Sequence, residues 1–225
     1  MMQGFVRGTI KLDASFTSYF HKQIVEEISK KIKKYAGSVA GELTEKIQQV
    51  VRERLSMCEE YGSLVGGALR AQLGIPNAEV SVADIVNMWV QGIGVTIETG
   101  SGSLLTVRIG IIKDDYVDVL SLDGSEYTYI RKHPPEKAGQ SQTIPWLQWL
   151  LLEGDRRIIV DYEFSPTKIG RSRMAGVMKK NSKKAWQVPS QYSGTSVDNF
   201  ATRALTNVHI DIEKIVESTL TSLIE

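Results

Sequence analysis

The stretch Ile144-Pro145-Trp146-Leu147-Gln148-Trp149-Leu150-Leu151-Leu152-Glu153-Gly154-Asp155 is the most apolar run of the chain. Its two tryptophans and four leucines can bury on the order of a few hundred Å² of apolar surface, at about 25 cal/mol per Å². Pro145 fits the first turn of a helix because its missing N–H loses no bond there, and Gly154 is typical of a helix end. We therefore predict a short buried helix that seeds the core. The predicted packing residues of the core are Trp146, Trp149, Leu150, Leu151, Trp186 and Phe200.

The composition is that of an ordinary globular protein. The chain has 225 residues, a formal net charge of +1, 42% apolar and 24% charged residues, so it is long enough for one large domain and is not a polycation. Its single cysteine, Cys58, excludes an internal disulfide bond and a thiolate metal cluster. We find no signal sequence, and no apolar run approaches the roughly 18 residues that span a bilayer. We therefore expect a protein made in the cytoplasm, with no membrane among its partners.

The N-terminal part of the chain has the apolar spacing of an α-helix. From about Ser15 to Met57, apolar residues recur at steps of three and four. They are Phe16, Phe20, Ile24, Ile28, Ile32, Tyr35, Val39, Leu43, Ile47, Val51 and Leu55. Each glycine costs about 1 kcal/mol relative to alanine within a helix, so we expect a kink or break near Gly37–Gly41. Unbroken, this helix is about 60 Å long, so it either folds back on its own domain or contacts a neighbouring subunit.

The rest of the chain alternates short helical segments with β-rich ones. The predicted helices run from the cap Ser63 to Leu73, from Asp84 to Trp89, and from Phe200 to Glu225. The predicted strands are Gly92–Thr99 and Leu104–Ile112, which form a hairpin, then Asp118–Leu122, Tyr127–Arg131 and Arg156–Phe164. The expected fold is α+β, with a long N-terminal amphipathic helix, a mostly antiparallel sheet of about four to five strands, short buried helices and a C-terminal helix. We expect a helical arm over residues 1–57 and an α+β domain over residues 58–225.

One segment has a strong local charge. Residues 168–184 contain seven basic side chains and no acidic one, and a field of this sign attracts polyanions. The basic residues are Lys168, Arg171, Arg173, Lys179, Lys180, Lys183 and Lys184. They predict a surface that lines a DNA channel without sequence specificity, or one that docks on an acidic partner. The plainer alternative is a solvated hairpin loop.

We find no pattern of catalytic or metal-binding residues in the sequence. The histidines lack the spacing of metal ligands, and no serine lies in a Gly-x-Ser-x-Gly nucleophile elbow. The histidines are His21, His133 and His209. Glu153 and Asp155 are the only candidate carboxylate pair for an enzyme, and the alternative is that they compensate the two arginines that follow them. We therefore predict no catalytic residue, no cofactor and no metal site, and a structural or binding role.

Three groups of segments occur together along the chain. The first is Glu60-Tyr61-Gly62-Ser63-Leu64 with Leu69-Arg70-Ala71-Gln72-Leu73-Gly74-Ile75, and the second is Pro145–Asp155 leading to Ile158-Ile159. The third is Gly170–Met174 followed by Trp186–Pro189, Gly194-Thr195, Asp198–Phe200 and Arg203–Leu205. In their order, and in the strands between them, they resemble the neck or tail-completion (head–tail joining) proteins of tailed bacteriophages. The resemblance extends from about Cys58 to Glu225.

This resemblance implies a non-enzymatic structural virion protein that forms a homo-oligomeric ring, a hexamer or a dodecamer, at the head–tail junction. The implied partners are neighbouring connector, tail terminator or tail tube proteins and, without sequence specificity, packaged DNA. The implied location is the neck or upper tail of the virion, after assembly in the host cytoplasm. The motifs do not separate adaptor, stopper, completion and terminator rings. The alternative is a sequence-independent DNA-binding module that acts through residues 168–184.

Overall fold

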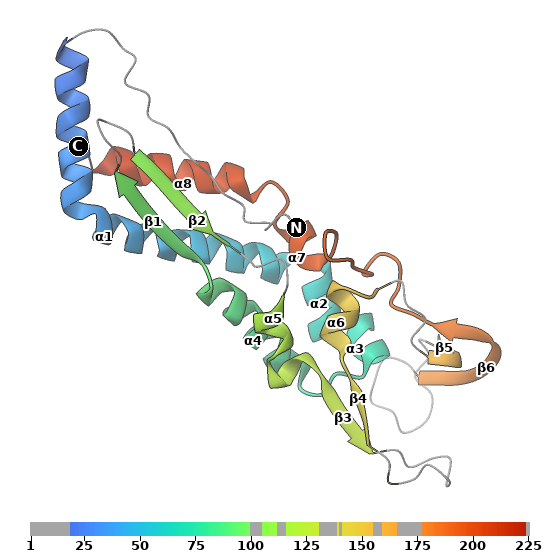
Figure 1. The fold of residues 1–225 in the computed structure, drawn as a ribbon. Coiled ribbons are helices and arrows are strands. Elements are labelled where there is room, and N and C mark those ends of the chain that lie inside the picture. The colour runs from blue at the N-terminus through green and yellow to red at the C-terminus, as the bar shows by residue number, and fades with distance from the viewer. Residues whose placement is uncertain are drawn as a thin grey trace. The chain divides into compact units, whose positions relative to one another are not determined.

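The structure, a computed structural model, describes residues 19–99, 105–111, 116–130, 139, 141–154, 159–165 and 177–223. It has the predicted α+β class, with a long N-terminal helix and a C-terminal helix (Figure 1). The helices are α1 (Tyr19–Met57), α2 (Glu59–Val65), α3 (Ala68–Leu73), α4 (Ala78–Gln91), α5 (Val117–Leu120), the 3-10 helix η1 (Asp123–Ser125), α6 (Trp146–Leu151), α7 (Phe200–Ala204) and α8 (Val208–Ser222). The strands are β1 (Gly94–Thr99), β2 (Leu105–Gly110), β3 (Tyr127–Ile130), β4 (Ser141–Ile144), β5 (Ile159–Ser165) and β6 (Val177–Trp186).

The chain forms two compact units. The first is drawn from the ranges Met1–Glu53, Trp89–Lys113 and Asn207–Glu225, and the second from Arg54–Met88 and Asp114–Thr206. The division into an arm over residues 1–57 and a domain over residues 58–225 stays a prediction. No helix among the described residues is both long enough and apolar enough to span a bilayer.

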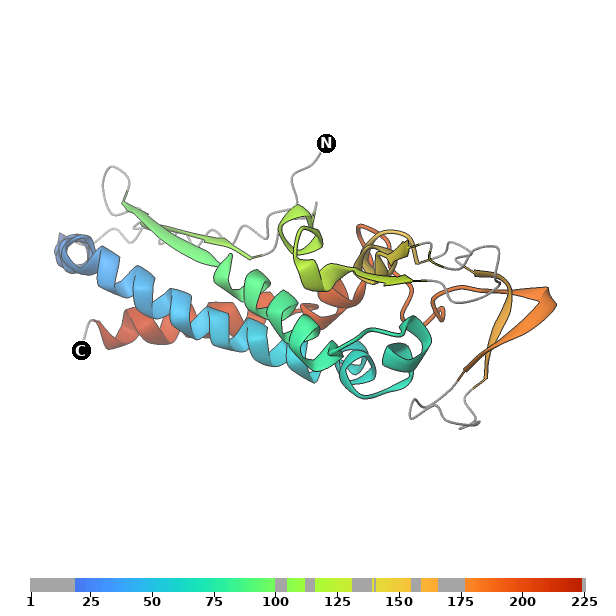
Figure 2. The same ribbon diagram turned by 90° about the horizontal axis from the view of Figure 1, so that it is seen from below.

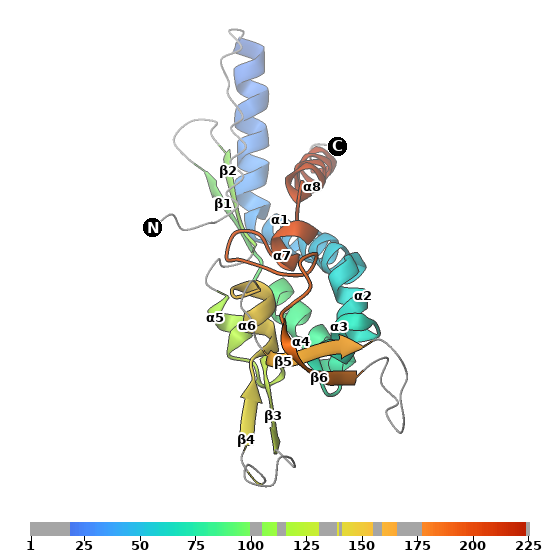
Figure 3. The same ribbon diagram turned by 90° about the vertical axis from the view of Figure 1, so that its right-hand side faces the viewer.

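The first unit is built on the apolar stripe of α1. The residues of this stripe recur every fourth position through Val39, Leu43, Ile47 and Val51, and all are at most 3% exposed. In α8 the buried residues Val208, Ile212 and Val216 follow the same period, as expected for helices that pack through one face. α8 runs beside α1, and the β1–β2 hairpin lies on another side of that helix (Figures 2 and 3).

Two polar contacts fix this packing. The Nζ atom of Lys46 donates to Thr219 Oγ1 of α8 at 2.9 Å. Gln48 Nε2 donates to the carbonyl oxygen of Ile93, just before β1, at 3.4 Å. The long helix is therefore held on both sides by segments distant in sequence.

Of the kink or break expected in α1, the structure has a bend but no break (Figure 1). The helix is continuous from Tyr19 to Met57, although its ribbon changes direction in the N-terminal half (Figure 1). A Cβ atom added at Gly37 or Gly41 meets nothing within 4 Å, so neither glycine is required by close packing. Their unfavourable helix propensity is offset by the buried stripe on either side of them.

The second unit has a core of short helices. α6, from the apolar run, is buried through Trp146, Leu147, Leu150 and Leu151. Trp146 Nε1 donates to the carbonyl oxygen of Gly124 in η1 at 3.0 Å. The short helix predicted for this run is confirmed.

The helix predicted from Ser63 to Leu73 is divided into α2 and α3. Ser63 lies inside α2, and its Oγ accepts a hydrogen bond from Leu69 N at the start of α3, at 3.1 Å. A Cβ atom at Gly67 lies 2.8 Å from Ser63 Cα, so a glycine is needed where the chain folds back on itself. The prediction of Ser63 as an N-cap is therefore wrong, although its hydroxyl accepts a hydrogen bond from the first turn of α3. The helix predicted from Asp84 also differs, because α4 already begins at Ala78.

The strands do not form one sheet of four to five strands. Among the described residues they form three separate two-stranded antiparallel sheets, β1–β2, β3–β4 and β5–β6. The predicted strands at 92–99, 104–112, 127–131 and 156–164 correspond to β1, β2, β3 and β5. Each of these strands pairs with one strand, the one next to it in chain order. The β1–β2 sheet belongs to the first unit, and the other two sheets belong to the second.

The strand predicted over Asp118–Leu122 is wrong, because this stretch begins with the helical turn α5. Its five residues are too few to separate a period of two from one of 3.6. The side chains then favour the turn: Ser121 Oγ donates to Asp118 O at 2.8 Å, and Ser125 Oγ donates to Leu120 O at 2.8 Å.

Candidate functional site

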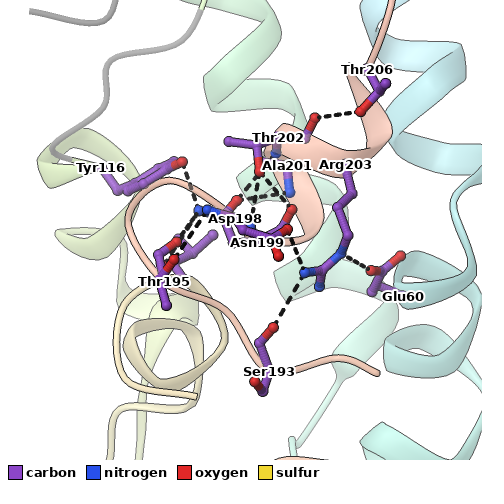
Figure 4. Close-up of polar contacts among 11 residues, drawn as sticks. Glu60, Tyr116, Ser193, Thr195, Asp198, Asn199, Ala201, Thr202, Arg203 and Thr206 are labelled. Atoms are coloured by element: carbon purple, nitrogen blue, oxygen red, sulfur yellow. Dashed lines mark hydrogen bonds and ion pairs between the residues drawn. The ribbon is translucent and has the colours of Figure 1, made fainter. Parts of the chain in front are cut away.

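The side chain of Asn199 is the centre of a buried polar cluster in the second unit (Figure 4). Asn199 is 0% exposed and precedes the first residue of α7. Its Oδ1 accepts from Ala201 N at 3.1 Å and from Thr202 N at 3.2 Å. Thr202 Oγ1 in turn accepts from Asn199 N at 2.9 Å. This capping box satisfies backbone N–H groups that have no partner within the helix.

The amide nitrogen of Asn199 connects α7 to other elements. Nδ2 donates to Tyr116 Oη at 2.8 Å and to Thr195 O at 2.8 Å, with a longer contact to Leu151 O at 3.4 Å. Tyr116 is 3% exposed and precedes α5, while Leu151 ends α6. One side chain therefore fixes the start of α7, the start of α5 and the end of α6.

Arg203 extends the cluster to α2. Its Nε donates to Glu60 Oε1 at 3.0 Å, and its Nη1 donates to Asp198 Oδ1 at 3.0 Å and Ser193 O at 3.3 Å (Figure 4). Glu60 is 7% exposed, so removing the Arg203 cation would leave a buried, unpaired carboxylate, which costs more free energy than an unpaired acid at the surface. We name Glu60, Tyr116, Thr195, Asp198, Asn199 and Arg203 the polar junction.

Two glycines let the backbone close beside the polar junction. Gly154 N donates to Gly194 O at 3.1 Å, and a Cβ atom at Gly154 collides with the Gly194 backbone. A Cβ atom at Gly194 collides with the carbonyl of Leu150. Gly154 therefore does more than end the helix of the apolar run, because it allows the backbones of two distant segments to touch.

The segment before the polar junction is attached to α2 and α3. Trp186 Nε1 donates to Gln72 Oε1 at 3.3 Å, and Tyr192 Oη donates to Glu59 Oε1 at 3.0 Å. Both aromatic rings are mostly buried, at 7% and 8% exposed. Residues 186–203 therefore run over α2, α3 and α6 and are bonded to each of them.

The polar junction is suited to fixing geometry. The donors and acceptors of Asn199 are used on other groups of the chain, and the carboxylate of Glu60 is paired with Arg203. Arg203 Nη2 is buried without a hydrogen-bond partner, but the other bonds of the network connect several elements and so favour one arrangement of them.

The predicted packing residues are mostly in the core. Five of them are at most 7% exposed: Trp146, Leu150, Leu151, Trp186 and Phe200. The sixth, Trp149, is half-buried.

The predicted basic segment is only partly described. Lys168, Arg171 and Arg173 lie outside the described residues, as does the side chain of Lys180, although Lys180 pairs with Tyr162 across β5 and β6. Lys179, Lys183 and Lys184 are exposed. The plainer prediction of a loop is wrong for residues 177–184, which belong to β6.

Glu163 of β5 lies among these lysines. Lys184 Nζ is 2.8 Å from Glu163 Oε2, and Lys179 is the cross-strand partner of Glu163. The hydrogen bond from Lys184, followed by one from Asn181, lowers the pKa of the Glu163 carboxyl below its usual value. The charged pair is therefore present at neutral pH and is lost as the pH falls through this lowered pKa.

The other candidates from the sequence do not assemble into a site. Glu153 accepts from Gln148 Nε2 at 2.9 Å, and Asp155 lies outside the described residues. His209 is exposed, His133 lies outside the described residues, and the side chain of His21 is not described. The described parts of the chain contain no group of three or more His, Cys, Asp or Glu side chains able to hold a metal ion.

The Cys58 thiol is expected to react slowly with alkylating reagents. Burial, the largest contribution, raises its pKa above the usual value, so less thiolate is present at a given pH and the rate falls. The rate of iodoacetamide labelling at pH 8, measured by intact mass, should be below that of the same protein in urea. It should rise above pH 9, and equal rates in the folded and unfolded protein contradict the assignment.

Comparisons of the chain with protein-family models, with curated proteins and with solved structures found no match.

The role of the polar junction was not predicted from the sequence. Asp198–Phe200 and Arg203–Leu205 were noted as motifs, but not as a cap and an ion pair. A local signal was present, because Asn199 precedes a helix and Thr202 stands three residues later, which is the spacing of a capping box. No sequence pattern indicates Tyr116 as the partner of Asn199, because the two are 83 residues apart. The same holds for Glu60 and Arg203, which are 143 residues apart.

Proposed function

We propose that this protein is a structural component of a tailed-phage virion, which forms a ring at the head–tail junction and joins the portal-side connector to the tail. It acts by binding, and its partners are copies of itself and the neighbouring connector, tail terminator or tail tube proteins. Its place is the neck or upper tail of the virion, after assembly in the host cytoplasm.

The observation that carries the proposal is that the segments with the phage-like motifs contact one another. Glu60, in the first group, pairs with Arg203 in the third. Gly154, in the second group, bonds with Gly194 in the third. Residues far apart in sequence thus form one structural unit, as expected if the motifs belong to one common architecture.

The long helix α1 supports the same proposal. Its 39 residues have one apolar stripe, which is buried in the described residues except at Tyr35, a predicted member that is 44% exposed. Charged residues such as Lys31, Lys33 and Glu45 are exposed on the other faces of the helix. A long helix of this kind is well suited to an assembly, because it presents a large polar surface to neighbouring subunits.

The proposal is tested by placing the protein in the virion. Antibodies raised against the purified protein should label intact phage particles at the junction of head and tail in negative-stain electron microscopy. When its synthesis is suppressed during infection, filled heads and separate tails should accumulate. Complete, infectious particles made without the protein contradict the proposal.

The exposed lysines of β6 favour a second candidate, a DNA-binding module without sequence specificity. Replacing Lys179, Lys183 and Lys184 by serine should then abolish retention of duplex DNA on a filter at low salt, since binding of this kind comes from phosphate neutralisation. If the protein is a structural ring component, the same variant still joins heads to tails in a complementation assay.

A further inference from the structure

The β5–β6 hairpin has a surface charge opposite to that of the segment around α5. We name residues 159–165 and 177–186 the basic hairpin, and residues 116–126 the acidic segment. We propose that the basic hairpin of one copy docks on the acidic segment of the next copy, so that the copies join head to tail. This inference rests on the proposed ring and names the contact that builds it.

The basic hairpin has an excess of positive charge. The sequence of residues 159–165 and 177–186 has four basic and two acidic residues. One of the two acids, Glu163, is already paired with Lys184, while Lys179 and Lys183 are exposed. The pairing of β5 with β6 shifts its register between Val160 and Tyr162. A shift of this kind bends the strand locally.

The acidic segment is a folded surface with the opposite sign. Asp118, Asp123 and Glu126 are exposed, and residues 116–126 include no basic residue. Val117, at 58% exposed, adds an apolar side chain to the same surface. An apolar contact surrounded by charges is the usual composition of a protein interface.

Internal contacts hold the acidic segment in place. Gly124 O accepts from the buried Trp146 at 3.0 Å, and a Cβ atom at Gly124 lies 3.1 Å from Ser81 Cβ. Tyr116, at the other end, bonds with Asn199 at 2.8 Å. The carboxylates therefore project from a fixed backbone, which reduces the entropy lost when a partner binds.

The two surfaces lie at opposite ends of the second unit. Figures 1 and 2 place α2, α3 and α6 between α5 and the β5–β6 hairpin. Within one copy they are too far apart to meet, whereas a second copy can bring its own hairpin to the acidic segment. A contact between two different surfaces of identical subunits is heterologous, and it generates a ring when the rotation between copies closes.

The first arm of the test is the unmodified, full-length protein. Sedimentation velocity should detect oligomers at about 50 mM salt, and raising the salt to about 500 mM should weaken the association, because ions screen exposed charges. The inference is overturned if the protein stays monomeric at low salt, or if the strength of association does not change with salt concentration.

The second arm uses charge reversal. The hairpin variant has Lys179→Glu and Lys183→Glu, and the segment variant has Asp123→Lys and Glu126→Lys; both leave the Lys184–Glu163 pair intact. Each variant alone should associate at least about tenfold more weakly, since attraction becomes repulsion. Combining all four substitutions in one chain should restore association, as should mixing the two variants.

A control variant gives the same change in net charge elsewhere. Lys214→Glu reverses one exposed lysine of α8 and should associate as the unmodified protein does, whereas Lys183→Glu alone, with the same change in net charge, should associate more weakly. If the hairpin variant loses only binding to duplex DNA while its self-association is unchanged, the basic hairpin is a DNA surface and the inference fails. The proposed function is judged separately, by the position of the protein in the virion.

Discussion

Trp146→Ala is expected to lower the free energy of unfolding of the second unit by about 4 kcal/mol. Trp146 is 1% exposed, so truncation leaves a large cavity in a core of short helices. The substitution also removes the donor that bonds Gly124 O at 3.0 Å. Urea unfolding followed by far-UV circular dichroism measures the loss.

The matched control for this substitution is Trp149→Ala, in the same short helix. Trp149 is only half-buried, and its removal should cost less than half as much as removal of Trp146, about 2 kcal/mol or below. If Trp146→Ala leaves the protein unfolded in buffer, Trp146→Phe keeps a six-membered aromatic ring in the core and should give a smaller, measurable loss, which combines the missing hydrogen bond with a smaller cavity. Equal effects at positions 146 and 149 contradict the assignment of Trp146 as the core anchor.

Asn199→Ala should be the most damaging change of a polar side chain, at about 3 kcal/mol. Loss of a helix cap costs about 1 kcal/mol, and the buried Tyr116 hydroxyl and Thr195 carbonyl lose a partner, which adds about 1–3 kcal/mol. Urea unfolding should show a lower midpoint with the same slope, because the change destabilises the folded state without altering the surface exposed on unfolding.

Two further variants separate the cap from the buried bonds. Thr202→Ala removes the reciprocal half of the capping box, a 2.9 Å bond from Asn199 N, together with the 3.0 Å bond from the Thr202 hydroxyl to Asn199 O, and should cost about 1 kcal/mol. Asn207→Gly changes another asparagine that precedes a helix, but its side chain makes no cap bond and its φ is 60°. Glycine adopts this conformation freely, so the effect should stay within about 0.5 kcal/mol. A large loss at Asn207, or a negligible one at Asn199, contradicts the role of the polar junction.

Elements with a long and regular pattern were predictable from the sequence. The stripe of α1 repeats over many turns, so its helical period is unambiguous, and the predicted Ile32, Val39, Leu43, Ile47, Val51 and Leu55 are all buried. The Gly100–Ser103 stretch separates two β-rich runs, and β1 and β2 pair on either side of it. Local chemistry is sufficient for such elements.

Short elements were not predictable, because tertiary contacts decide them. The turn α5 is held from outside by Trp146 and Asn199, whose bonds to Gly124 and Tyr116 cannot be read from local sequence. The division of α2 from α3 depends on the approach of Gly67 to Ser63. The grouping of strands into separate pairs depends on long-range packing that strand propensity does not include.

The polar junction was missed for a related reason. An asparagine before a helix indicates a cap, but nothing in the sequence indicates whether its remaining N–H groups meet water or the protein. Here they meet Tyr116 and Thr195, and only the fold makes those residues neighbours of Asn199.

The separate pairing of the strands has a consequence for local opening. In each described two-stranded sheet, a strand has a partner on one side only, so roughly half of its amide hydrogens face away from the pair. In deuterium oxide these amides should exchange early, and β3–β4 or β5–β6 can fray without disturbing β1–β2. The slowest exchange should then come from α1 and α6, so that helices, rather than sheets, determine how long the folded state persists.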